Sequence, residues 1–212
     1  MNDKNLIDEL VSNHSKVKPT ASIKARCIKW FLVCLLCLSS GISMLGLRED
    51  WTRLFTSPIL LIQNVFILIG IVIAGVLAIK LSVPSATTKR SGIKFLYILG
   101  GLWAVILFSL GILNHASFDE LAKLGFGCVR DIVVIGFVPG AALFIFIRQG
   151  IVLERKLVGV IGMVASFGIG VFGVQYTCHN DGALHILVWH FLPLIVLGGS
   201  GVVIGKKNLE KL

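Results

Sequence analysis

The sequence predicts an all-α polytopic membrane protein, a bundle of six transmembrane helices with a short cytoplasmic amphipathic helix at the N-terminus. The chain is 56% hydrophobic and only 15% charged, a composition outside the range of soluble globular domains. It also contains six apolar runs, each close to the roughly 20 residues that a helix needs to cross a bilayer. We therefore expect a cytoplasmic segment over 1–26, a six-span domain over 27–205 and a cytoplasmic tail over 206–212.

The N-terminal segment is polar and basic and carries one short helical pattern, expected over about 3–13. Its apolar residues recur at helical spacing while the acidic ones fall on another face; they are Leu6, Ile7, Leu10 and Val11, against Asp8 and Glu9. Isolated helices shorter than about 12–15 residues are marginal in water. We expect this helix to become ordered against a partner or the membrane surface.

The six spans are predicted over 28–47, 59–81, 95–113, 132–147, 157–176 and 184–204. The fourth is short, but it can include Cys128 and Val129 if Arg130 and Asp131 pair or snorkel. Small residues four positions apart favour close helix packing in lipid; they are Gly70/Ala74, Gly136/Gly140, Ser166/Gly170 and Gly201/Gly205.

Basic residues are concentrated on one side of the predicted bundle. They lie in the N-terminal segment, the second and fourth connections and the C-terminal tail, whereas the opposite side has more acidic than basic residues. The positive-inside rule then puts both termini in the cytoplasm. The net charge of +9 thus reports topology, with the lipid bilayer as partner and no direct contact with nucleic acid.

The final connection concentrates the reactive side chains of the chain. Cys178 and His179 precede a helix that Asn180 or Asp181 can cap and that starts at about Gly182. Helical spacing puts Asp181, His185 and Trp189 on one face.

Two histidines belong to the sixth span, where polar groups tend to be functional. His185 and His190 differ by five positions, so they do not share a face as a metal-binding pair four apart would. His185 is the better ligand candidate, and His190 is expected to form a hydrogen bond across helices. Gln63, Asn64 and Gln175 could supply the partner.

The predicted topology puts Cys128 and Cys178 on the same non-cytoplasmic side. Two such thiols can form a disulfide or bind a soft metal with imidazole help. Arg130 and the helix start after Cys178 would each lower a thiol pKa. The alternative is a plain structural disulfide, or two unrelated cysteines. Cys34 and Cys37 lie in mid-span, where cysteine packs as a small hydrophobe.

Several functional classes find little support in the sequence. There is no phosphate-binding loop, serine elbow or paired intramembrane carboxylate, so we do not expect an enzyme. Two rivals stay open for the Cys/His cluster: an entry site in a small metal or solute transporter, and a membrane thiol oxidoreductase.

Four stretches resemble the NrsF-type anti-sigma factors, inner-membrane negative regulators of extracytoplasmic-function sigma factors. They are Leu6-Ile7-Asp8-Glu9-Leu10, Gly46-Leu47-Arg48-Glu49-Asp50, Leu81-Ser82-Val83-Pro84, and Cys178-His179-Asn180-Asp181 with Leu184, His185, Trp189 and His190. The resemblance covers essentially the whole chain, and the last stretch is its most specific part.

The resemblance implies a sensor whose N-terminal segment holds the sigma factor at the membrane. The contact would be made by Leu6, Ile7, Asp8, Leu10 and Val11. Periplasmic cysteines would register heavy metal or oxidative stress and release it. The sensing pair maps to Cys178 and Cys128, and His179, Asp181 and His185 complete the predicted set. No cofactor is required, although a soft or heavy metal ion would bind transiently.

Overall fold

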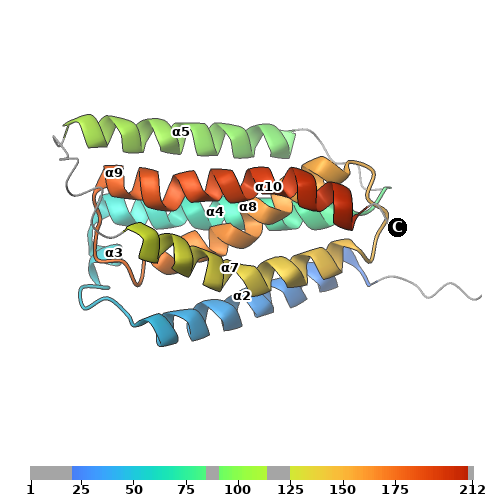
Figure 1. The fold of residues 1–212 in the computed structure, drawn as a ribbon, viewed down its shortest axis with the longest axis horizontal. Helices are drawn as coiled ribbons and strands as arrows, with labels where there is room; N and C mark the ends of the chain where they lie inside the picture. The colour runs from blue at the N-terminus through green and yellow to red at the C-terminus, as the bar shows by residue number, and fades with distance from the viewer. Residues whose placement is uncertain (1–20, 85–90, 114–124, 210–212) are drawn as a thin grey trace, which may run out of the picture.

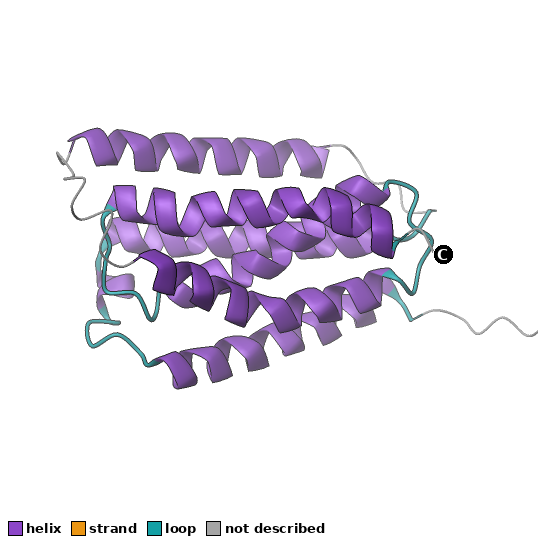
Figure 2. Ribbon diagram, in the orientation of Figure 1, coloured by secondary structure: helices purple, strands orange, loops and turns teal. Residues whose placement is uncertain are grey.

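The computed structural model describes residues 21–84, 91–113 and 125–209. The amphipathic helix predicted over 3–13 lies outside the described residues, and so do its sigma-factor contacts Leu6, Ile7, Asp8, Leu10 and Val11. The described part is helical and contains no strand (Figure 2).

Six helical segments are long and apolar enough to cross a membrane. Five are single helices: α2 (Ile23–Leu45), α4 (Pro58–Lys80), α5 (Ser91–Leu113), α7 (Gly125–Ile147) and α8 (Arg155–Val174). The sixth runs without interruption through α9 (Ala183–Ile186), the π-helical turn η1 (Leu187–Phe191) and α10 (Leu192–Asn208). A short helix, α3 (Arg53–Thr56), lies in the first connection. The all-α, six-span prediction is confirmed.

The fourth span departs most from its predicted start. α7 begins at Gly125, seven residues before the predicted start at 132, and so includes Cys128. Arg130 Nε donates a hydrogen bond of 2.9 Å to Asp131 Oδ1, the local pairing that was expected to allow this extension. The helix therefore carries a thiol in its first turn.

α8 is the central helix of the bundle. In its most apolar stretch 78% of the residues are buried, against 17–39% in the other five spans. Small residues on α8 let its neighbours approach at backbone distance, since a Cβ on Gly170 would lie 2.2 Å from Ile132 O of α7. A Cβ on Gly159 would lie 2.0 Å from Gly201 O of α10. The predicted glycine positions on α7, α8 and α10 thus serve packing within one chain.

The two ends of the bundle differ in what they carry. The first residues of α2 and the end of α10 lie at one end, whereas α3, the start of α7 and α9 gather at the other (Figure 1). We call the latter the α3/α9 end. It holds the reactive side chains of the final connection.

The glycine contact between α8 and α10 predicts a position-specific loss of stability. Gly159→Ala puts a methyl group onto the Gly201 carbonyl, and overpacking of this kind costs about 1–3 kcal/mol. Gly199→Ala is the matched control, because nothing lies within 4 Å of a Cβ at Gly199. Thermal unfolding in detergent micelles should show a lower midpoint for the first variant alone. Equal midpoints would contradict the packing described here.

Candidate thiol–imidazole site

The two thiols predicted to face one side of the membrane lie in contact. Cys128 projects from the first turn of α7, and Cys178 follows the end of α8. Their Sγ atoms are 3.5 Å apart, although 50 positions separate them in sequence. The two sulfurs are not joined in a disulfide. The contact arises because α7 and α8 run in opposite directions at glycine-limited distance, which brings the start of one beside the end of the other.

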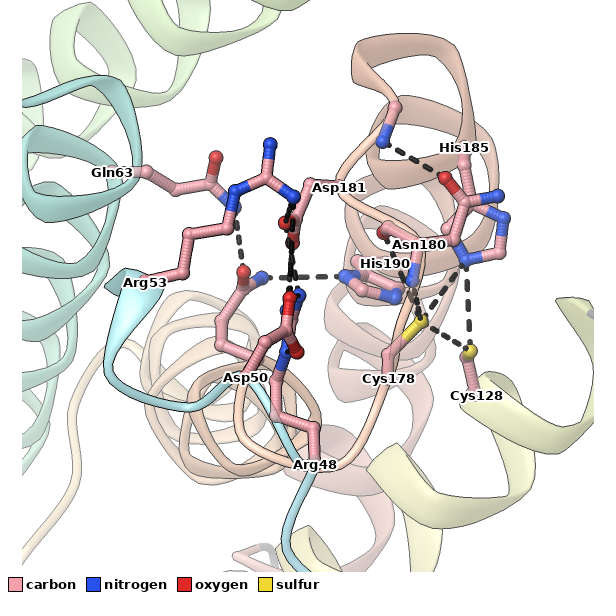
Figure 3. A network of polar contacts seen from close by, with 12 residues as sticks. Arg48, Asp50, Arg53, Gln63, Cys128, Cys178, Asn180, Asp181, His185 and His190 are labelled. Carbon is pink, nitrogen blue, oxygen red and sulfur yellow. Dashed lines mark hydrogen bonds and ion pairs between the residues drawn. The ribbon is translucent and has the colours of Figure 1, made fainter. Parts of the chain in front are cut away.

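His185 lies against both sulfurs. Its Nε2 is 3.6 Å from Cys128 Sγ and 3.5 Å from Cys178 Sγ. The ring is buried, with 4% of the residue exposed. This histidine, the better ligand candidate from sequence, thus sits with the two thiols at the α3/α9 end (Figure 3).

The expectation that His185 and His190 occupy different faces is wrong. Residues 187–191 form a π-helical turn, in which backbone hydrogen bonds join residues five apart and each turn holds more than the 3.6 residues of an α-helix. The wider turn brings side chains five positions apart close together, and the two imidazole rings meet edge to face with centroids 5.3 Å apart. π-Turns occur frequently at functional sites. Here the turn adds a second imidazole to the cluster.

Four side chains in total could hold a metal ion within the described residues: Cys128, Cys178, His185 and His190. One donor atom from each lies within 4.8 Å of the other three. His190 also makes the predicted interhelical hydrogen bond, since its Nδ1 is 3.3 Å from Gln175 Nε2. Gln175 Oε1 accepts a bond of 2.8 Å from Gln63 Nε2 of α4.

The surroundings of Cys178 favour its thiolate. The hydrogen bond from the Cys128 thiol, together with the neighbouring imidazoles of His185 and His190, lowers the pKa of the Cys178 thiol. The backbone N–H of Asn180 also points at Cys178 Sγ, at 3.5 Å. The cause differs from the one expected for Cys178, the start of the following helix, because neighbouring side chains lower this pKa. Arg130, which was expected to act on Cys128, binds Asp131 through its guanidinium. A thiolate at Cys178 is both a nucleophile and a metal ligand.

A buried arginine holds the connection that carries Cys178. Arg48 is 1% exposed, and its guanidinium binds Asp181 through two hydrogen bonds of 2.7 and 2.9 Å. Two more bonds, of 2.6 and 2.9 Å, go to Asp50. The Arg48 backbone N–H donates to Tyr176 O at 2.9 Å. This arginine clamp ties the first connection to the last.

The clamp is electrostatically matched. The hydrogen bonds from Arg48 hold the pKa of Asp50 at about 2, so this carboxylate stays ionised. Arg53, which is exposed, adds a weaker contact of 3.7 Å to Asp181. Sequence reasoning assigned no role to Arg48. Two signals were available: a charged Arg-Glu-Asp run directly after an apolar span, and the place of Arg48 in one of the four stretches that resemble the family.

Three predicted features of the final connection have other roles than expected. Asp181 bonds to Arg48 rather than capping the helix, and the Asn180 side chain accepts the Gly182 N–H at 2.9 Å. His179 is exposed and does not belong to the four-residue group. Trp189, which was expected on one face with Asp181 and His185, packs on Gly125 and Phe126 of α7. The predicted sensing set thus loses His179 and Asp181 as direct neighbours of the sulfurs and gains His190.

The fold and the site together define an all-helical membrane protein with a buried thiol–imidazole cluster at one end of its bundle. The chain belongs to the NrsF family, negative regulators of sigma F, whose family model matches residues 10–210. The resemblance seen in the sequence is therefore confirmed over nearly the whole chain, and the family implies negative regulation of a sigma factor. No curated protein and no solved structure matches the sequence.

The arginine clamp predicts that Cys178 depends on Arg48 for its protection. In Arg48→Met the carboxylates of Asp50 and Asp181 lose their partner, and the last connection opens more often. A local destabilisation of about 1.4 kcal/mol would raise the open population, and with it the rate of thiol alkylation, about tenfold.

Arg53→Met is the control for this experiment, because Arg53 is 62% exposed and only touches the clamp. Alkylation rates at Cys178, followed by mass spectrometry of the purified protein, should rise in the first variant and stay near wild type in the second. Equal rates in both would show that the clamp does not hold the connection.

Proposed function

We propose that this protein is an inner-membrane anti-sigma factor for an extracytoplasmic-function sigma factor. Its N-terminal segment holds the sigma factor at the cytoplasmic face. Cys128 and Cys178, with His185 beside them, receive heavy-metal or oxidative stress on the periplasmic side, and the sigma factor is then released.

One observation carries this proposal. Two thiols 50 positions apart in sequence meet at 3.5 Å, in contact with the same imidazole. A packing role for cysteine requires no such convergence, whereas a thiol sensor does. Membership of the family supports a sigma factor as the partner, and the thiol–imidazole cluster is a site at which a stimulus could act.

The orientation is supported by charge. Lys206 and Lys207 lie at the end of α10, and Lys24, Arg26 and Lys29 lie at the start of α2. These two helix ends share one end of the bundle (Figure 1). The positive-inside rule favours a cytoplasmic location for that end, and this supports a periplasmic location for the thiols.

Either stimulus, an oxidant or a metal ion, would react directly with the two sulfurs. Oxidation would join the two sulfurs and release two protons, while two electrons pass to an oxidant such as a peroxide or another disulfide. A soft divalent metal would instead bind both sulfurs as thiolates and displace any proton that either still carries. Each event pulls the start of α7 toward the connection after α8.

A route to the cytoplasmic end runs from α7 to α2. Trp30 Nε1 donates a hydrogen bond of 3.0 Å to Pro139 O, midway along α7. Arg26 Nη1 donates to Phe146 O, at the far end of α7, and to Ser82 Oγ, just after α4. Both donors belong to α2, the helix that directly follows the N-terminal segment. A shift of α7 would therefore change the hydrogen bonds that hold the first turns of α2, to which the N-terminal segment is attached.

The stimulus can act only by favouring one of two bundle states. A metal or a disulfide stabilises whichever arrangement of α7 brings Cys128 closest to Cys178. If that arrangement alters the bonds to Trp30 and Arg26, the sigma-factor contact is weakened. The N-terminal helix would bind the sigma factor as a helix in a groove.

Replacing the two cysteines separates sensing from repression. With a reporter driven by the sigma factor, Cys128→Ser/Cys178→Ser should keep transcription low and abolish induction by metal or oxidant. Deleting residues 1–20 should instead give high transcription without any stimulus. Cys37→Ser, a change of a half-buried thiol on α2, is the matched control and should respond as wild type.

Normal induction of the reporter by metal or oxidant in the double mutant would contradict the sensing proposal. The transporter and thiol-oxidoreductase alternatives predict another pattern in the same strains. Deleting residues 1–20 would leave transport or thiol exchange intact, and the cysteine changes would alter metal uptake or exchange rates instead of transcription.

A further inference from the structure

We infer that Cys128, Cys178, His185 and His190 form a tetrahedral, two-sulfur and two-nitrogen site for a divalent cation of the zinc class. His190 is the new member of the set. The inference deepens the proposed function by naming one input. Metal binding by these four side chains does not itself require that the protein regulate a sigma factor.

Donor spacing is the first argument. Tetrahedral zinc bonds of about 2.3 Å to sulfur and 2.0–2.1 Å to nitrogen put two sulfurs about 3.8 Å apart and a sulfur and a nitrogen about 3.6 Å apart. The observed sulfur–sulfur distance is 3.5 Å, and the distances from His185 Nε2 are 3.6 and 3.5 Å. Three donors thus already stand at the spacing of three corners of a tetrahedron.

His190 provides the fourth donor. Its Nδ1 faces Gln175, while the other ring nitrogen points toward the sulfurs (Figure 3). That Nε2 is buried and has no hydrogen-bond partner among the described residues, and the residue is only 1% exposed. A buried nitrogen without a partner costs free energy, and a ligand that accepts its lone pair removes this cost. Since all four donors lie within 4.8 Å, closing the site needs a shift of about 1 Å.

The charge of the donor set fits a divalent ion. Two thiolates and two neutral imidazoles balance a 2+ charge, which matters because an uncompensated charge in a buried site is costly. Both cysteines bind as thiolates, so any proton still on a sulfur passes to solvent as its metal bond forms. Two sulfurs and two nitrogens in tetrahedral array are typical of zinc rather than of Mg²⁺ or Ca²⁺, which take oxygen ligands.

Two glutamines act as positioning residues for His190. Gln63 Nε2 donates to Gln175 Oε1 at 2.8 Å, and Gln175 Nε2 lies 3.3 Å from His190 Nδ1. In that polarity Nδ1 accepts, and the proton of the neutral ring resides on Nε2. Coordination through Nε2 moves the ring proton to Nδ1, which then donates to Gln175 Oε1 while Gln175 Nε2 donates to Gln63 Oε1. Metal binding therefore reverses the donor–acceptor direction of the buried hydrogen bonds that run from His190 to Gln63 of α4.

The test uses the full-length protein, reduced, stripped of metal and held in detergent micelles. Co²⁺ is titrated as a spectroscopic probe, Zn²⁺ is then used to displace it, and X-ray absorption of the Zn²⁺ form counts the ligands. We expect one equivalent of Co²⁺ with the intense visible bands of a tetrahedral thiolate site. We also expect two sulfurs at about 2.3 Å and two nitrogens at about 2.0–2.1 Å from zinc.

Three variants assign the ligands. His190→Ala should weaken Zn²⁺ binding by about 100-fold, and Gln175→Met, which removes the hydrogen bond to Nδ1, by about 10–100-fold. His179→Ala is the matched control, because this imidazole adjoins Cys178 but is exposed and stands outside the four-residue group. The Zn²⁺ affinity of this variant should equal that of the wild-type protein. The absorption data on the unmodified protein hold even if one variant does not fold.

Some results overturn the inference. They are absence of stoichiometric binding, a shell without two nitrogens, or wild-type affinity in His190→Ala. If no metal binds but the cysteine changes still abolish the oxidant response in cells, the metal site is wrong and the proposed function stands. If the four-donor site binds zinc but transcription responds to no stimulus, the site stands and the proposed function fails.

Discussion

The close contact between α7 and α8 is the constraint on which the candidate site depends. In lipid, helices gain little from burying apolar surface against each other, so close backbone approach must supply the association. Gly170 lets α8 meet Ile132 O, and Gly136 lets α7 meet Phe167. A bulkier residue at either position would push the helices apart. Cys128, one turn before Ile132, and Cys178, beyond the end of α8, would then separate as well.

Two further devices complete what the helix contact begins. The π-turn over Leu187–Phe191 brings His190 onto the same face as His185, and the arginine clamp fixes the connection that carries Cys178. Each device joins segments far apart in the sequence: α7, the connection after α8, the sixth span and the first connection. A small change in the distance between the two sulfurs therefore alters the contacts of several helices at once.

Hydropathy was sufficient to predict six spans and to put both thiols on one side, because apolar length is a strong signal in a membrane protein. The π-turn could not be predicted, since a helical repeat of 3.6 puts residues 185 and 190 on different faces and nothing in the local sequence marks the wider turn over Leu187–Phe191. The role of Arg48 was missed for a different reason. Its partner Asp181 is 133 positions away, and a local charge pattern does not reveal a contact across the bundle.

The central claim is that the thiol site faces the periplasm while the chain ends face the cytoplasm. It is tested most directly with single cysteines in a protein whose native cysteines are replaced by serine. His179→Cys marks the exposed neighbour of the site and Lys207→Cys marks the exposed end of α10. A membrane-impermeant maleimide applied to cells with a permeabilised outer membrane should label position 179, and should label 207 only after lysis. Labelling of 207 with protection of 179 would invert the topology and contradict the account.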